Sequence, residues 1–331
     1  MRMSPGPWLW AGLALLATAL ALVSLTLGPA ALSLGRVVAA AAGAGDPIAG
    51  DIVRQIRAPR VVLDLAVGAT LGLAGAALQG LLRNPLADPS VLGTSSTAAL
   101  GAVLALYFGL AREQPWVLPA MAVAGALAGL ALLLPLARAG EGSATLLLAG
   151  VAVSALGGAG VSLALNLAPN PFAVTEIAFW LLGSLSDRSW KHVALAAPGM
   201  LLAAGVIVSK RRALDALVLG EDAAGSLGFD LRRTSALLAV ATAAGVGSAV
   251  AVAGSIGFVG LVAPHLMRPF TDGRPGRLLA PAALAGAVLL TAADLVVRLV
   301  PTATELRLGV VTAFLGAPVF TAVLLRTRRM G

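Results

Sequence analysis

The charged residues of this 331-residue chain, which are the main candidates for chemistry, are unusually dense in one stretch. Residues 210–233 read KRRALDALVLGEDAAGSLGFDLRR and hold nine charged side chains in 24 positions, whereas only 11% of the whole chain is charged. Basic clusters begin and end this stretch, and membrane proteins usually keep such clusters in the cytoplasm. The pattern predicts a helical segment that projects on the cytoplasmic side of a membrane protein. An ordinary solvated loop is the alternative.

The order of residues within this stretch predicts two short helices. Gly220 and Gly228 stand where a bend and a helix C-terminus require a residue without a Cβ atom. Glu221 and Asp222 would occupy the first turn of the second helix, where negative charge is favoured. The expected helices cover 213–219 and 221–227.

Several kinds of chemistry are excluded or poorly supported by composition. The chain has no Cys and only two His, His192 and His265, so thiolate sites are excluded and a His-rich metal site is not expected. His265 follows a proline and is interpreted as a structural hydrogen-bonding residue. No GxxxxGK[ST] phosphate loop occurs, so the chain cannot by itself be a P-loop ATPase. The net charge of +8 does not indicate nucleic-acid binding, because the arginines are scattered between apolar runs.

Apolar runs of about 20 residues recur along the chain, which is the length that crosses a bilayer. With 59% hydrophobic residues and 39 Gly, the sequence predicts an all-α polytopic membrane protein with closely packed helices. Residues 29–58 are expected to form a Gly/Ala/Pro-rich connection, and 173–186 a short outer helix that does not cross. The ten expected spans cover about 8–28, 61–82, 91–111, 116–137, 144–167, 190–209, 234–253, 254–270, 278–300 and 308–325.

The distribution of basic residues predicts the orientation of these spans. If both termini are cytoplasmic, fourteen of the 23 Lys and Arg face the cytoplasm and nine face outward, in agreement with the positive-inside rule. Four of the outer nine lie within 36–60, a local excess that topology does not explain. Two pairs four residues apart, Arg60 with Asp64 and Asp294 with Arg298, are spaced to form ion pairs on a helix face.

Five stretches, in order along the chain, resemble the permease subunits of bacterial ABC importers for iron chelates, haem and cobalamin. They are RAPRVVLDLAVGATLGLAGAALQGLLRNPLADPSVLGTSS at 57–96, WLLGSLSDRSW at 180–190, LDALVLGEDAAGSLG at 214–228, GSIGFVGLVAPHLMR at 254–268 and ELRLGVVTAFLGAPVF at 305–320. The resemblance implies a single transmembrane permease domain over 1–331, in the inner membrane, with about ten helices.

The same resemblance implies partners. A second permease copy would complete a homodimer or a heteromeric pair, two ATPase subunits would bind in the cytoplasm, and a soluble binding protein would dock outside. The chain itself would be no enzyme and would bind no cofactor or metal, because ATP and Mg²⁺ would be used by the partner ATPase.

Three groups of residues match positions that have roles in this family. The segment 211–229 matches the ATPase-coupling element, with Leu214, Leu219, Gly220, Glu221, Asp222, Gly225 and Gly228. Positions along the pathway and its gates are matched by Asn84, Leu86, Ser143, Trp180, Gly183 and Ser184. Arg57, Arg60 and Arg298 match the basic positions at which these permeases bind the binding protein.

Each group has a simpler structural interpretation. The two prolines around Leu86 could merely end a helix, and Trp180 could anchor the membrane interface. Arg60 and Arg298 could merely neutralise Asp64 and Asp294. Thr97 and Arg307 replace a Gly and a Pro that are frequent in the family, which affects expectations for substrate transfer and not for the fold.

The predicted function is a permease that moves a ferric siderophore or a similarly large chelate, with haem and cobalamin as alternatives. An ion-coupled carrier is a second class. Such carriers usually place acidic residues in the middle of the membrane, whereas Asp64 and Asp294 lie toward span ends beside arginines. An intramembrane enzyme is a third class, which the lack of a nucleophile with a base or of a metal cluster disfavours.

Overall fold

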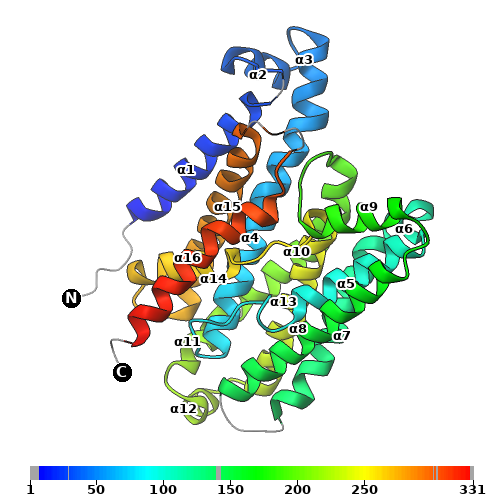
Figure 1. Cartoon of the computed structure of the whole chain (residues 1–331). Helices are drawn as coiled ribbons and strands as arrows, with labels where there is room; N and C mark the ends of the chain where they lie inside the picture. Colours follow the sequence, from blue (N-terminus) through cyan, green and yellow to red (C-terminus); the bar gives the residue numbers. More distant parts are fainter. Residues whose placement is uncertain (1–6, 29, 139–142, 301, 303–304, 329–331) are drawn as a thin grey trace.

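The protein folds into a bundle of helices in the computed structural model, which describes residues 7–28, 30–138, 143–300, 302 and 305–328 (Figure 1). One end of the bundle carries α2 (Leu34–Ala41) and α3 (Pro47–Asp51), and we call it the α2–α3 end. The other end carries α11 (Arg211–Leu217) and α12 (Glu221–Ser226), which we call the handle. No strand occurs in the described part of the chain.

All ten predicted spans are helical. In the described part of the chain, seven helical segments are long and apolar enough to cross a membrane, and shorter apolar helical segments lie in α5, in α14 and at Leu308–Thr321 of α16. The chain is thus a polytopic all-α membrane protein. Its helices outside the α2–α3 end and the handle are α1 (Pro7–Thr26), α4 (Ala58–Leu81), α5 (Thr94–Tyr107), α6 (Leu110–Glu113), α7 (Val117–Arg138), α8 (Ser143–Asn166), α9 (Pro171–Leu181), α10 (Trp190–Ser209), α13 (Leu231–Ala253), α14 (Val259–Met267), α15 (Pro275–Leu299) and α16 (Leu308–Arg328).

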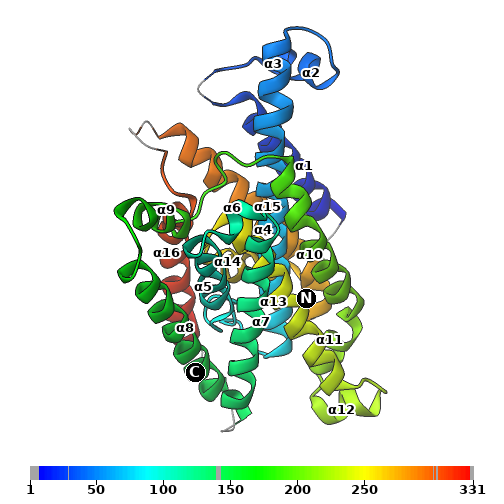
Figure 2. The same cartoon turned by 90° about the vertical axis from the view of Figure 1, so that its right-hand side faces the viewer.

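Residues 29–58, predicted as a Gly/Ala/Pro-rich connection, are largely helical in the part that the structure describes. Asp46 caps α3 by accepting a hydrogen bond from the Ile48 amide at 3.0 Å, and Pro47 sits at the first helical position, where it is tolerated. A π-helical turn, Ile52–Arg57, continues α3 into α4, so that 47–81 form one helix that projects beyond the bundle (Figure 2). The turn precedes Pro59, which lacks the N–H that a regular α-helix uses.

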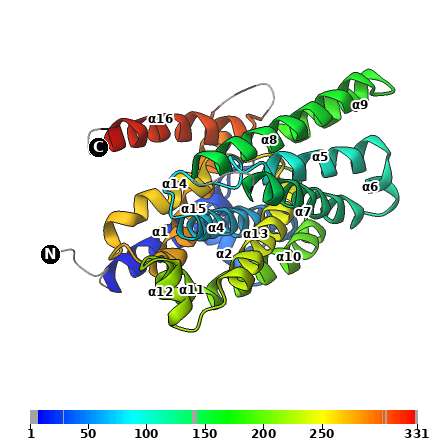
Figure 3. The same cartoon turned by 90° about the horizontal axis from the view of Figure 1, so that it is seen from below.

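The centre of the bundle is the pair α4 and α15, which have the most extensive contact of any two helices (Figure 3). Their backbones touch through glycines. A Cβ atom on Gly72 would stand 2.2 Å from the carbonyl oxygen of Ala282, and one on Gly286 would stand 2.2 Å from that of Gly68. Such close approach is how helices gain packing energy in a membrane, where lipid is as apolar as a leucine side chain.

Candidate functional sites at the two ends of the bundle

The handle consists of two short helices, as the sequence predicts, although both differ slightly from the expected bounds. Gly220 separates them with a backbone φ of +103°, and Gly228 follows α12 with a φ of +87°. Residues that have a Cβ atom rarely adopt such positive φ angles. Asp230 then caps α13 by accepting a hydrogen bond from the Arg233 amide at 2.9 Å.

One face of α11 fixes the handle to the centre of the bundle. Leu214 is fully buried within a cluster that includes Leu279 of α15. Asp215 accepts a hydrogen bond at 2.8 Å from the amide of Gly276, in the first turn of α15. Leu214 therefore positions α11 and does not itself present a surface.

The other face of the handle presents apolar side chains to the surroundings. Leu219 is 67% exposed, and Val218 and Leu227 are also exposed. Glu221, Asp222 and Gly225 are exposed beside them. Exposed apolar residues next to acidic ones are typical of a protein-binding surface.

The predicted pathway residues lie in two separate groups. Near the handle, the side-chain oxygen of Asn84 accepts a hydrogen bond from the Leu86 amide at 2.9 Å, which shapes the RNPLADP turn. Arg83 of the same turn pairs with Glu221 of the handle at 3.3 Å. Ser143 is the first residue of α8, and its side chain lies outside the described residues.

The second group lies toward the opposite end. Trp180 is in the last turn of α9, and Gly183 turns the chain with φ +75°. The Ser184 amide donates to the carbonyl oxygen of Ala253 at 2.8 Å, and its hydroxyl contacts Ser186 at 3.0 Å. The predicted outer helix over 173–186 therefore ends earlier, at Leu181, because Gly183 breaks it.

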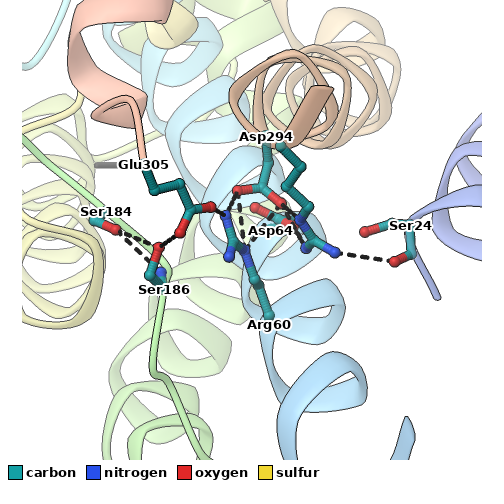
Figure 4. A network of polar contacts seen from close by, with 8 residues as sticks. Ser24, Arg60, Asp64, Ser184, Ser186, Asp294 and Glu305 are labelled. Carbon is teal, nitrogen blue, oxygen red and sulfur yellow. Dashed lines mark hydrogen bonds and ion pairs between the residues drawn. The ribbon is translucent and has the colours of Figure 1, made fainter. Parts of the chain in front are cut away.

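A buried network of charges joins α4 and α15 at their ends toward α2 and α3 (Figure 4). The Arg60 guanidinium binds Asp294 at 2.7 Å and also Glu305, just before α16. The predicted pair of Arg60 with Asp64 is therefore wrong, since the close contact of the two helices brings Asp294 within reach. The predicted pair of Arg298 with Asp294 is confirmed, with Nε to Oδ2 at 2.8 Å.

Arg57 lies beside this network but binds the backbone. Its guanidinium donates to the carbonyl oxygens of Leu25 at 2.7 Å and Thr26 at 2.8 Å, and also to that of Ala30. Carbonyl groups at a helix C-terminus lack partners within the helix, so Arg57 satisfies the end of α1. Only 5% of Arg57 is exposed.

The structure nonetheless brings the three predicted docking arginines together. Arg57, Arg60 and Arg298 line one cavity of about 410 Å³, together with Glu305 and apolar side chains. Asp294 pairs with Arg60 and Arg298, and Glu305 pairs with Arg60. Asp64 is fully buried, with its nearest cationic partner, Arg298, at 3.8 Å.

Glu305 and Ser186 are the members of the network that sequence reasoning missed. Ser186 donates its hydroxyl to Glu305, so the carboxylate connects the loop after α9 to Arg60. Burial alone would raise the pKa of Glu305, but the hydrogen bonds from Arg60 and Ser186 hold that pKa below its usual range. The sequence signal that could have identified Glu305 was its position: it is a lone acidic residue just before the last span, on the side of the membrane with excess arginine.

Comparison with known proteins identifies the chain's relatives. Residues 15–326 match the FecCD transport family. The chain belongs to this family. It is 43% identical over 280 residues to the Fe(3+) dicitrate transport system permease protein FecD of Escherichia coli (strain K12), covering 84% of this chain and 86% of FecD. The chain is therefore an ABC transporter permease, the transport component of such a system.

Other relatives of this FecCD-family permease differ in their named cargo. The vitamin B12 import system permease protein BtuC of Citrobacter koseri is 40% identical over 277 residues, 84% of each chain. An uncharacterized ABC transporter permease, YvrB of Bacillus subtilis (strain 168), is 42% identical over 294 residues, covering 87% of this chain and 83% of YvrB. A solved structure described as an inward-facing conformation of a transporter assigned to the metal-chelate type superposes with a TM-score of 0.82 at 31% identity. It covers 96% of this chain and 99% of that one.

The network predicts a large cost for removing its central carboxylate. Asp294→Asn would leave Arg60 and Arg298 buried without the anion they share, a change that typically destabilises by about 3–5 kcal/mol. We expect a large fall in the melting temperature of the detergent-solubilised protein and in its yield.

The matched control is Glu176→Gln, which breaks the exposed pair with Arg112 (3.1 Å) and should cost less than about 1 kcal/mol. Equal melting temperatures for the two variants would show that the network contributes nothing to the stability of the bundle.

Proposed function

We propose that this FecCD-family permease belongs to an ATP-driven importer that moves a ferric siderophore or a similarly large metal chelate. The named cargo of FecD and the metal-chelate type of the structural neighbour support this class of substrate. Cobalamin is the second candidate, supported by the likeness to BtuC. Haem stays a third possibility within the family resemblance.

The handle is the observation that carries the proposal. Its inner face is fixed to α15 through Leu214 and Asp215, while Leu219 and Leu227 are exposed. An element held this firmly, with an apolar outer face, is suited to receive force from a partner. We infer that two cytoplasmic ATPase subunits, which use ATP and Mg²⁺, bind the handles of two permease copies. The chain itself would hydrolyse no ATP.

The orientation follows from this assignment. If the handle is in the cytoplasm, the first residues of α1 lie nearer the cytoplasmic end of the bundle than its last residues do (Figure 1). The last residues of α16 likewise lie toward the cytoplasmic end. Both termini would then be cytoplasmic and the α2–α3 end would face outward across the inner membrane. Closure of the ATPases would move α11, and the movement would pass to α15 and α4 as a shift of packed helices.

Coupling through the handle is tested by replacing two residues that have no role in the core. A Cβ atom at Gly225 of α12 meets nothing within 4 Å, and Glu221 is exposed. In liposomes with the cognate ATPase and binding protein, wild type should take up the chelate that the binding protein retains. Glu221→Leu with Gly225→Leu should insert and assemble normally, yet its ATPase should no longer respond to the loaded binding protein.

Arg112→Gln, at the opposite end, is the control and should transport like wild type. Unchanged transport and ATPase stimulation in the double variant would refute the role of the handle. A cognate binding protein that retained only a sugar or an amino acid would refute the substrate class.

We further propose that carboxylates of the binding protein enter the cavity lined by Arg57, Arg60 and Arg298. Within the cavity, Arg60 already forms an ion pair with Glu305 of the same chain. A carboxylate from the partner would compete with Glu305 and thereby loosen its bond to Ser186 in the loop after α9. Arginine–carboxylate pairs are directional, which suits placing a ligand above a pore.

Competition with Glu305 predicts a gain of affinity. Glu305→Gln removes the internal rival for Arg60, so the binding protein should associate more tightly at low salt, by up to about 1 kcal/mol. Salt titrations of binding to the reconstituted permease would measure this. Arg36→Gln, an exposed arginine at the same end, should change the affinity little. Weaker or unchanged association in Glu305→Gln would refute the competition.

A further inference from the structure

A second polar cavity lies at the handle end, away from the arginine cavity described above. It has a volume of about 290 Å³, at the small end of the usual range for ligand sites. Its lining comes from the end of α4, the turn between α14 and α15, and the handle residue Val218. The lining includes Gln79, Arg83, Arg268 and Arg274 but no acidic residue.

The positive charge of this cavity is poorly compensated by the protein. Arg268 is half-buried and forms no ion pair within the described residues; its Nη2 donates to the side-chain oxygen of Gln79 at 2.7 Å. Arg274 likewise has no ion pair in the described part of the chain, and Arg83 has only the exposed Glu221.

One further donor points to a missing acceptor. Gln79 is only 3% exposed, and its side-chain nitrogen has no hydrogen-bond partner. Burying such a group without a partner is costly.

We propose that this cavity binds a phosphate-bearing anion, held by Arg268 and Arg274, with Gln79 as a supporting donor. Guanidinium groups bind phosphate oxygens in pairs, and the cavity is too small for a large chelate. Gln79 is in the last turn of α4 and Leu278 in the first turn of α15, so both lie at the ends of membrane-spanning helices, where lipid headgroups are expected. The phosphate can therefore belong to an anionic phospholipid or be free in solution.

The test measures binding to the purified full-length chain in a neutral detergent. Phosphatidylglycerol and inorganic phosphate are titrated separately, with phosphatidylcholine and chloride of equal ionic strength as references, and the melting temperature is followed. We expect saturable stabilisation by phosphatidylglycerol. If phosphate stabilises as well, free phosphate also occupies the site; if not, the lipid headgroup is its ligand.

Variants connect the effect to this cavity. Arg268→Gln should weaken binding roughly ten- to a hundredfold, the usual effect of losing a charged hydrogen bond. Gln79→Glu is nearly isosteric and places an internal carboxylate within reach of Arg268, so it should abolish binding without unfolding the chain. Arg112→Gln, an exposed arginine at the other end, should bind like wild type.

Three results would overturn the proposal. The first is no saturable stabilisation by phosphatidylglycerol or phosphate. The second is equal binding by wild type and Gln79→Glu. The third is stabilisation only when the ATPase subunit is added, which would assign Arg268 to a carboxylate of that partner.

Discussion

The contact between α4 and α15 through bare backbone is the constraint on which the rest of the structure depends. Gly72 and Gly286 leave no room for a Cβ atom, and Gly75 meets the backbone of Gly260 on α14 in the same way. In a bilayer, close packing of this kind replaces the hydrophobic effect as the main attraction between helices. The pair forms one continuous unit that reaches both functional ends.

At the handle end, this unit provides the seat for α11. A Cβ atom on Gly80 of α4 would stand 2.6 Å from Pro275, and one on Gly276 would stand 2.3 Å from the carbonyl oxygen of Arg211. The handle therefore packs directly against the first turn of α15. A displacement of α11 would therefore act directly on the first turn of α15.

At the α2–α3 end, the same contact makes the charge network possible. Ionisable side chains within a membrane span are costly, about 2.5–3.5 kcal/mol each at the centre of an inserted helix. Arg60, Asp294 and Arg298 reduce that cost by binding one another near the helix ends. Glu305 extends the network to α16 and, through Ser186, to the loop after α9, so a partner bound there would act on several helices at once.

Features set by local spacing could be predicted from the sequence. The ten helices follow from the apolar runs, the two handle helices from Gly220 and Gly228, and the Asp294–Arg298 pair from its spacing of four. Long-range features could not. Arg60 and Asp294 are 234 positions apart, so their pairing depends on how α4 meets α15.

Two other misses have the same physical origin. Arg57 resembled a free surface charge, because the carbonyl groups that it binds at the end of α1 come from the tertiary fold. Residues 29–58 were predicted only as a connection, although Pro47 begins a helix there and a π-helical turn continues it into α4. The predicted roles of the coupling, gating and docking residues stay predictions.

The central claim, that the handle is the contact surface for an ATPase, can be measured directly because the chain contains no cysteine. Leu219→Cys places a single thiol on the exposed face of the handle, and Leu110→Cys places one near the opposite end. The rate of thiol labelling is measured with and without the cognate ATPase subunit. The account predicts that the ATPase protects Leu219→Cys strongly and leaves Leu110→Cys unaffected. Equal labelling of Leu219→Cys in an assembled complex and in the free permease would contradict it.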